Sequence, residues 1–210
     1  MYNLNIRDMQ RGEIDTAVEL ATQAFSDYDY FTNFFPDAEE RHKVQAAMMR
    51  REYRTNFGRA QYLVAEENGQ IMATAQLNPP TYRKPSDLVY ILHGWLGIYR
   101  AGDRKRIDAW LDMDGQAGAP CHNFAAREEG VWYVSSLTVS PKAQGTGIGI
   151  RFLDAMEDRA RQDGGKWLTL FTNSEKNIAY YRHRGFEVFD ERTLTTPNGP
   201  MKSWSVKKAL

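Results

Sequence analysis

Three glycines alternate with other residues directly before a helical pattern. They are Gly145, Gly147 and Gly149, in the segment QGTGIGI. Apolar residues then recur at three- to four-residue spacing over residues 148–160, which predicts an amphipathic helix. The first N–H groups of such a helix lack partners within it and carry the positive end of the helix dipole. We interpret the loop as a phosphate-binding site, with tight turns and close helix packing as the alternative use of its glycines.

The spacing of these glycines separates the classes of phosphate-binding loop. A Walker loop ends in Gly-Lys-Ser/Thr, and no lysine follows Gly149. A dinucleotide fingerprint that starts at Gly145 needs glycine or alanine at position 150, where Ile150 stands. The loop also lies two-thirds of the way along the chain, whereas a dinucleotide fold carries it in its first strand–helix unit. These patterns argue against a nucleotide-binding protein of either class.

The elements around the loop are predicted from apolar periodicity and from turn residues. Residues 132–139 are predicted to form a strand, and the helix after the loop is expected to end at Gln162 before Asp163-Gly164-Gly165. The nearly continuous apolar run after these residues predicts a buried strand. Upstream, Asn68-Gly69 predicts a tight hairpin turn. The remaining expected strands are Asn3–Arg7, Tyr62–Ala65, Ile71–Leu77, Lys166–Thr172, Phe186–Leu194 and Met201–Lys207, and the helices are Arg11–Phe25, Asp37–Asn56, Asp87–Tyr99 and Glu175–Arg184. Residues 115–120 are expected to form a loop.

Composition restricts the kinds of partner that the protein can have. The 210 residues contain 27 Lys plus Arg and 27 Asp plus Glu, so no whole-chain field attracts nucleic acid or an anionic membrane. The chain shows no signal peptide or membrane-spanning run, which predicts a cytoplasmic protein. The single cysteine, Cys121, excludes an internal disulfide and favours a packed, unreactive thiol. A 42% hydrophobic content suffices for one domain with a sizeable core, and no metal site is expected.

Two motifs resemble those of one known family. Gln144–Gly149, preceded by Leu137-Thr138-Val139, resembles the Gln/Arg-x-x-Gly-x-Gly/Ala signature of the GCN5-related N-acetyltransferases (GNAT). Further on, NIAYYRHRGF at residues 177–186 resembles the second motif of that family. Trp132-Tyr133 lead into the central part of the predicted strand, and Asn177 lies four residues before Tyr181. In both features the chain is similar to the branch that includes puromycin N-acetyltransferase. The resemblance covers residues 132–189, and two features depart from it: Thr146 in the loop, and His183-Arg184 before Gly-Phe.

The resemblance implies an α+β fold of the GNAT type, with a central, mostly antiparallel mixed sheet of six or seven strands flanked by helices. It implies one domain over residues 1–210, with an insertion at about 78–130. The implied reaction moves the acetyl group of acetyl-CoA to a primary amine of a small molecule or peptide, by direct attack through a tetrahedral intermediate. The alternative is a non-catalytic acyl-CoA-binding module or sensor on the same fold.

The resemblance also assigns roles to residues. Tyr181 corresponds to the general acid that protonates the leaving thiolate. A backbone N–H between Ser136 and Val139 corresponds to the donor that stabilises the oxyanion. The implied coenzyme-binding residues are Leu137, Thr138, Val139, Gln144, Gly145, Thr146, Gly147, Ile148, Gly149, Asn173, Asn177 and Tyr180. The alternatives without a catalytic or binding role are that Tyr181 is a half-buried core residue and that Asn177 is a surface residue.

The acceptor site and the general base stay open from the sequence. Asp27 and Asp29 lie among the aromatic residues of 25–35, a composition that suits a cationic amine, although the aromatics can equally form packed core. The oligomeric state is also open. The candidates for the general base, none of them favoured, are Glu128, Glu129, His93, His122 and Asp27.

Overall fold

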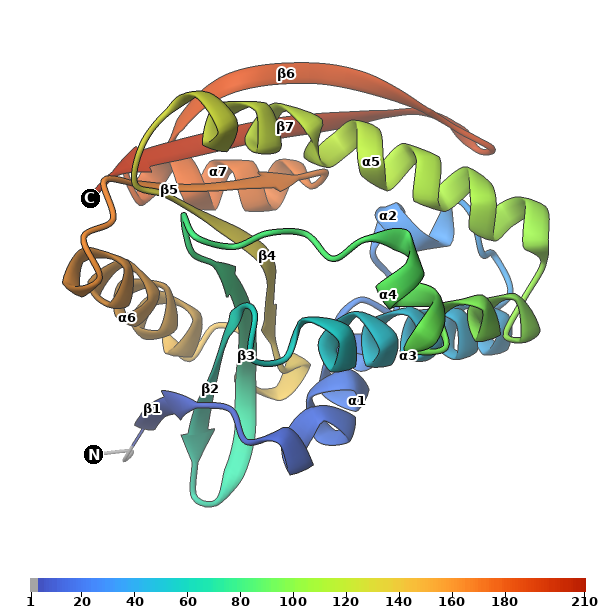
Figure 1. Cartoon of the computed structure of the whole chain (residues 1–210), viewed down its shortest axis with the longest axis horizontal. Coiled ribbons are helices and arrows are strands. Elements are labelled where there is room, and N and C mark those ends of the chain that lie inside the picture. Colours follow the sequence, from blue (N-terminus) through green and yellow to red (C-terminus); the bar gives the residue numbers. More distant parts are fainter. Residues whose placement is uncertain (1–3) are drawn as a thin grey trace.

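Seven strands form one open sheet in the computed structural model, which describes residues 4–210 (Figure 1). The strand order is β1-β2-β3-β4-β5-β7-β6. Every neighbouring pair is antiparallel except β4 with β5, which confirms the predicted fold class. The strands are β1 (Leu4–Asp8), β2 (Gln61–Glu67), β3 (Gln70–Asn78), β4 (Val131–Val139), β5 (Trp167–Thr172), β6 (Glu187–Thr196) and β7 (Gly199–Ala209).

Helices pack on both faces of the sheet, because its strands alternate between two cores. Leu63 of β2 joins a core with Phe152 of α6, whereas the next residue, Val64, joins a core with Ile14 of α1. Thus α6 and α7 cover one face, while α1, α3 and α5 lie on the other. None of the helices described in residues 4–210 is long and apolar enough to cross a membrane. The helices are η1 (Arg11–Glu13), α1 (Ile14–Ala24), α2 (Asp29–Thr32), α3 (Ala38–Asn56), α4 (Asp87–Leu92), η2 (Trp95–Arg100), α5 (Arg104–Arg127), η3 (Pro141–Ala143), α6 (Ile148–Gln162) and α7 (Glu175–His183).

Local turn signals in the sequence are matched by the backbone. Asn68 and Gly69 have φ angles of 52° and 77° and join β2 to β3, as predicted for a primed hairpin turn. The first strand was expected from Asn3, which lies outside the described residues, and β1 begins at Leu4. The expected helix over residues 87–99 is wrong in its length. It divides at Gly94, whose φ of 81° ends α4 before η2 begins.

The expected loop over residues 115–120 is also wrong, because these residues lie inside α5. Five residues of α5 are buried at helical spacing: Ile107, Trp110, Met113, Ala117 and Cys121. This stripe packs against β4, β5, β6 and β7. Tertiary burial therefore outweighs the local preference of Gly115, Gly118 and Pro120 for turns.

A specific contact compensates for the proline within α5. Pro120 has no N–H to donate to the carbonyl of Gln116, four residues earlier. That carbonyl instead accepts a hydrogen bond from Arg192 Nη1 of β6 at 3.1 Å. Arg192 is itself held by Asp190, with a 2.7 Å bond from Nε. The helix thus continues through Pro120 because a distant strand satisfies the carbonyl.

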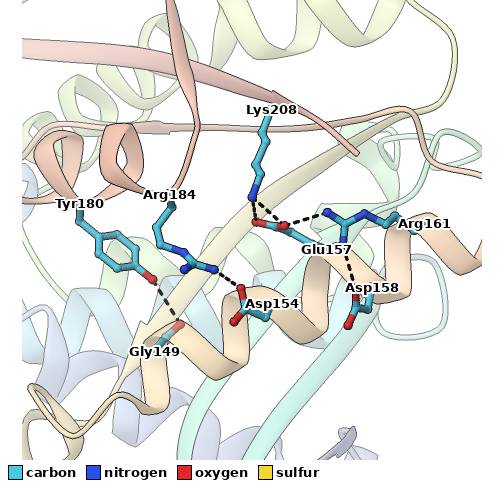
Figure 2. A network of polar contacts seen from close by, with 8 residues as sticks. All are labelled: Gly149, Asp154, Glu157, Asp158, Arg161, Tyr180, Arg184 and Lys208. Atoms are coloured by element: carbon cyan, nitrogen blue, oxygen red, sulfur yellow. Dashed lines mark hydrogen bonds and ion pairs between the residues drawn. The ribbon is translucent and has the colours of Figure 1, made fainter.

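A buried carboxylate ties α6 to the last strand (Figure 2). Glu157 is only 3% exposed, and both of its oxygens accept hydrogen bonds from Lys208 Nζ of β7, at 2.7 and 2.8 Å. Arg161, one turn further along α6, donates to the same carboxylate at 3.1 Å. These contacts fix α6 against the sheet.

Replacing the lysine of this network should destabilise the protein. We expect Lys208→Met to lower the free energy of unfolding by about 2–4 kcal/mol, because the buried Glu157 carboxylate then keeps only Arg161 as its cation. Urea denaturation would measure the loss. The double variant Glu157→Gln/Lys208→Met, which buries no charge there, should lose less than Lys208→Met alone; an equal or larger loss would contradict this explanation.

Candidate functional site

The glycine loop and the first turn of α6 contain three residues without side chains, Gly145, Gly147 and Gly149. Gly145 and Gly147 have φ angles of 79° and 86°, which only glycine adopts without strain, and nothing lies within 4 Å of a Cβ built on either. Gly149 has a different reason to be glycine. A Cβ there would lie 3.4 Å from Val139 Cγ2, so α6 begins close against the end of β4.

Backbone N–H groups of this loop are free to bind a ligand. Within residues 4–210, the amides of Gly145, Gly147 and Gly149 donate to no acceptor. Ile148 is 4% exposed, so its side chain anchors the helix in the core and only its backbone faces the loop. Gln144 and Thr146 are exposed at the rim, and the Thr146 hydroxyl donates to the carbonyl of Ala143 at 2.7 Å. The geometry is that of an anion site at a helix N-terminus.

The two central strands separate beside this loop. Strands β4 and β5 pair over only three residues, Val131 to Tyr133, and the rest of β4 has a partner only in β3. A β-bulge lies at the point of separation, because Gln76 pairs with Ser136 and Leu77 with Val134, which leaves Ser135 as an extra residue. Beyond the bulge, the β4 edge that faces β5 carries unpaired backbone groups. The predicted residues 137–139 lie along that edge.

Helix α7 holds the predicted tyrosine next to this opening. Tyr181 is 8% exposed, packs on Phe186, and its hydroxyl has no hydrogen-bond partner among the described residues. Burial raises the pKa of Tyr181 above the ordinary value of a phenol, so the group stays protonated at neutral pH. Its proton is therefore present at neutral pH and is not engaged by another group of the described structure.

Two contacts fix α7 against the start of α6, as Figure 2 shows. The Tyr180 hydroxyl donates to the carbonyl of Gly149 at 3.4 Å, and Arg184 forms an ion pair with Asp154. Tyr180 therefore lies at the glycine loop, whereas Tyr181 faces the core. Arg184, which departs from the family pattern, serves to join the two helices.

The two predicted asparagines have different environments. Asn173 follows β5, and its Nδ2 donates to the carbonyl of Lys202 at 3.1 Å. Its Oδ1 is buried without any partner in the described structure, which leaves an acceptor available at the strand opening. Asn177 is exposed on the first turn of α7, and only its backbone N–H is held, by Ser174 Oγ at 3.4 Å.

The aromatic stretch between α1 and α3 is packed core. Tyr30, Phe31, Phe34 and Phe35 are buried together, and Phe31 stacks on Trp110 of α5 with 5.2 Å between the ring centroids. Asp27 and Asp29 are exposed, as are Glu128, Glu129 and His93. The sequence hypothesis of an amine site built from these aspartates and aromatics therefore gains no support from the structure.

The sequence interpretation missed a carboxylate with an unusual environment, Glu52 of α3. Asn56 Nδ2 donates to its Oε1 at 2.7 Å, and the residue is only partly exposed. Burial raises the pKa of Glu52 to about 7, and the nearby Asp114 adds to the shift, against the effects of Tyr90, Gln76 and Lys84. The available signal was that Glu52 shares a helical stripe with the buried Met48.

The raised pKa of Glu52 makes stability depend on pH in a definite direction. The ionised carboxyl is less favourable in the fold than in the unfolded chain, so the wild type loses stability as pH rises from 4.5, the ordinary value, through about 7. Glu52→Gln lacks this titration. We expect its unfolding free energy relative to wild type to rise by about 1–3 kcal/mol between roughly pH 5 and pH 8. Urea denaturation at both values would measure it, and a pH-independent difference would contradict it.

Comparison with known proteins agrees with this geometry. The sequence model of the acetyltransferase (GNAT) family matches residues 26–186. No curated protein sequence matches the chain significantly. Among solved structures, the ribosomal-protein-S18-alanine N-acetyltransferase of Escherichia coli superposes with a TM-score of 0.60 at 13% identity, covering 98% of this chain and 93% of the other.

Two further structures share the fold. A polyamine N-acetyltransferase of Drosophila melanogaster gives a TM-score of 0.62 at 16% identity, covering 99% of this chain and 100% of the other. A GNAT-family acetyltransferase of Brucella melitensis in complex with acetyl-CoA gives a TM-score of 0.51 at 16% identity, covering 100% of this chain and 90% of the other. With the family sequence model spanning most of the chain, these findings show that the chain belongs to the acetyltransferase (GNAT) family and is an acetyl-CoA-dependent N-acetyltransferase.

Proposed function

We propose that this enzyme transfers the acetyl group of acetyl-CoA to a primary amine of a small molecule or peptide, by direct attack through a tetrahedral intermediate. The observation that carries the proposal is the pairing of free amides at the start of α6 with the unpaired edge of β4. We further propose that residues 1–210 form one catalytic domain, in which residues 78–130 are an insertion on the acceptor side.

The residues around the strand opening fit acetyl-CoA. The amides of the loop, with Gln144 and Thr146 at its rim, would hold the pyrophosphate at the positive end of the α6 dipole. The free backbone edge of β4 at residues 137–139 would bind the pantetheine arm as a further strand does. The unpartnered Oδ1 of Asn173 supplies one more acceptor, and Asn177 and Tyr180 border the same region.

In the proposed reaction the chain's own groups take three roles. The amine nitrogen forms a bond to the thioester carbon while the carbonyl electron pair moves to oxygen, and a backbone N–H of β4 after the bulge at Ser135 stabilises that oxyanion. The oxygen pair then re-forms the carbonyl and the C–S bond breaks. Tyr181 donates its proton to the departing sulfur, and the tyrosinate recovers a proton from the new amide nitrogen.

The fold does not choose between a small amine and a peptide as acceptor. The Drosophila enzyme is described as forming N-acetylagmatine, whereas the Escherichia coli enzyme is described as acting on an alanine of ribosomal protein S18. Both share their fold with this chain at 16% identity or less. The acceptor must therefore be argued from this chain's own side chains.

Adding a negative charge to the loop should weaken coenzyme binding. We expect Thr146→Asp to raise the acetyl-CoA dissociation constant at least about tenfold relative to Thr146→Ala, since both lose the hydroxyl bond but only Asp repels the pyrophosphate. Isothermal titration calorimetry would compare the two. Equal affinities would show that the phosphates bind elsewhere.

Removing the Tyr181 hydroxyl should slow the reaction without affecting coenzyme binding. We expect Tyr181→Phe to lower kcat by about 10²-fold or more, since it removes the general acid. The acetyl-CoA dissociation constant should change little. A matched control is Tyr99→Phe, in which the lost hydroxyl donates to the exposed Asp108. If Tyr181→Phe retains the kcat of that control on an active acceptor, Tyr181 is not the acid.

A further inference from the structure

Titratable groups from three segments lie near one another beside the sheet: the loop after β3, helix α3 and helix α5. The charge of Lys84 acts on Glu52 of α3 and on both Asp114 and His122 of α5. The ring of His122 packs at a tilt against that of Tyr133 of β4, with 4.9 Å between ring centroids. In Figure 1 the segment that carries Lys84 crosses in front of β4 on its way from β3 to α4. The segment between β3 and α4 thus passes over the central strand β4 in this view, and its Lys84 acts on two carboxylates, Glu52 and Asp114.

Glu52 is the carboxylate in this region that a hydrogen bond holds in place outside the aromatic core. Its side chain is ordered by Asn56, whose Oδ1 in turn accepts a 2.8 Å hydrogen bond from the Tyr82 hydroxyl. Asp114 is already engaged by the Tyr30 hydroxyl within the aromatic core. The groups that face Glu52 are Asn56 of α3, Gln76 of β3, Tyr82 and Lys84 of the following loop, Tyr90 of α4 and Asp114 of α5, with Tyr53 and Tyr62 nearby.

The sheet register connects Glu52 to the point where β4 and β5 separate. Gln76, one of the groups that act on the pKa of Glu52, is the register partner of Ser136, the residue after the bulge. Tyr53, adjacent to Glu52 in α3, has its hydroxyl 3.5 Å from Ser136 Oγ. Glu52 therefore lies on the α3 face of the sheet, opposite α6, and its neighbour in the sequence, Tyr53, contacts the residue after the bulge.

We propose that this region binds the acceptor as a protonated primary amine and that Glu52 takes the proton that the amine must lose. The inference rests on the proposed acetyl transfer. The ammonium gives one proton to the Glu52 carboxylate, which frees the nitrogen lone pair for attack on the thioester carbon. Glu52 then releases this proton to water, so that the net products are the acetylated amine, the free thiol of CoA and one proton. The phenol rings of Tyr82 and Tyr90 suit a cation that carries a small apolar body.

Lys84 competes with such an acceptor for the carboxylates. Its charge lowers the pKa of both Glu52 and Asp114, as a bound ammonium would. Lys84 is exposed and makes no ion pair in the described structure, so it can move away when a cation arrives. Lys84 should thus weaken the binding of a cationic acceptor, whereas Glu52 should strengthen it.

The first test is the pH dependence of the wild type, Glu52→Gln and the control Glu39→Gln, which removes an exposed carboxylate from the same helix. The assay uses purified full-length protein, acetyl-CoA and benzylamine, which is protonated at neutral pH. We expect wild-type kcat/KM to rise with pH and to level off above about pH 7, following ionisation of Glu52. Glu52→Gln should lose this limb and about 10²-fold or more of kcat/KM at pH 8. Glu39→Gln should behave as wild type.

The second test compares the KM of a charged and an uncharged amine, to show whether the acceptor binds as a cation. We expect Lys84→Met to lower KM for benzylamine about two- to tenfold at low salt, and the gain to shrink as salt is added. Aniline, which is uncharged at the same pH, should show no such change. An unchanged or raised KM for benzylamine in Lys84→Met would overturn the assignment of a cationic acceptor. A Glu52→Gln enzyme with the wild-type pH profile would overturn the role of Glu52.

Failure of the inference and failure of the proposed function give different results. If the wild type acetylates amines but Glu52→Gln does so equally well, only the role of Glu52 is wrong. If the wild type acetylates only peptides, the small cationic acceptor is wrong. If acetyl-CoA neither stabilises the wild type thermally nor donates to any amine or peptide, the proposed acetyl transfer itself fails.

Discussion

The separation of β4 from β5 is the constraint on which the site depends. Two adjacent parallel strands normally continue their ladder, yet these pair over three residues and then diverge, with a bulge at the point of divergence. Unpaired N–H and C=O groups inside a fold are costly unless a partner satisfies them. A ligand that enters as an extra strand meets that requirement. The two helices that follow the separating strands, α6 and α7, necessarily begin near the opening, and each brings one functional feature to it.

The alternation of side chains along β3 and β4 separates two environments. One face carries the apolar core against α6 and α7, which anchors Ile148, Phe152 and Tyr181. The other face presents Gln76 and Ser136 toward α3. A strand that is one residue out of register would exchange these faces, and the bulge at Ser135 shifts the register locally. The sheet thus has the phenol of Tyr181 on one side and the carboxylate of Glu52 on the other.

Lys84 and Asp114, which lie between β3 and β4 in the sequence, contribute to the electrostatics of the second face. The whole chain is neutral, with equal numbers of acidic and basic residues, yet Glu52, Asp114 and Lys84 lie within range of one another under the segment between β3 and β4. Burial raises the pKa of Glu52 and of Asp114, and the charge of the exposed Lys84 lowers both. Such a local arrangement is invisible in a net charge.

The sequence by itself determined the features that depend on a few consecutive residues. The glycine loop, the helix after it and the Asn68-Gly69 turn follow from backbone preference and apolar period, which are local properties. The family motifs and the buried, unreactive Cys121 were predicted in the same way; burial raises the pKa of its thiol to about 11. The tertiary structure alone decided that α5 continues through Pro120, because Arg192 supplies the missing donor from another strand. It alone decided the pKa of Glu52 and left Asn173 Oδ1 without a partner, because both depend on groups that meet only when distant segments fold together.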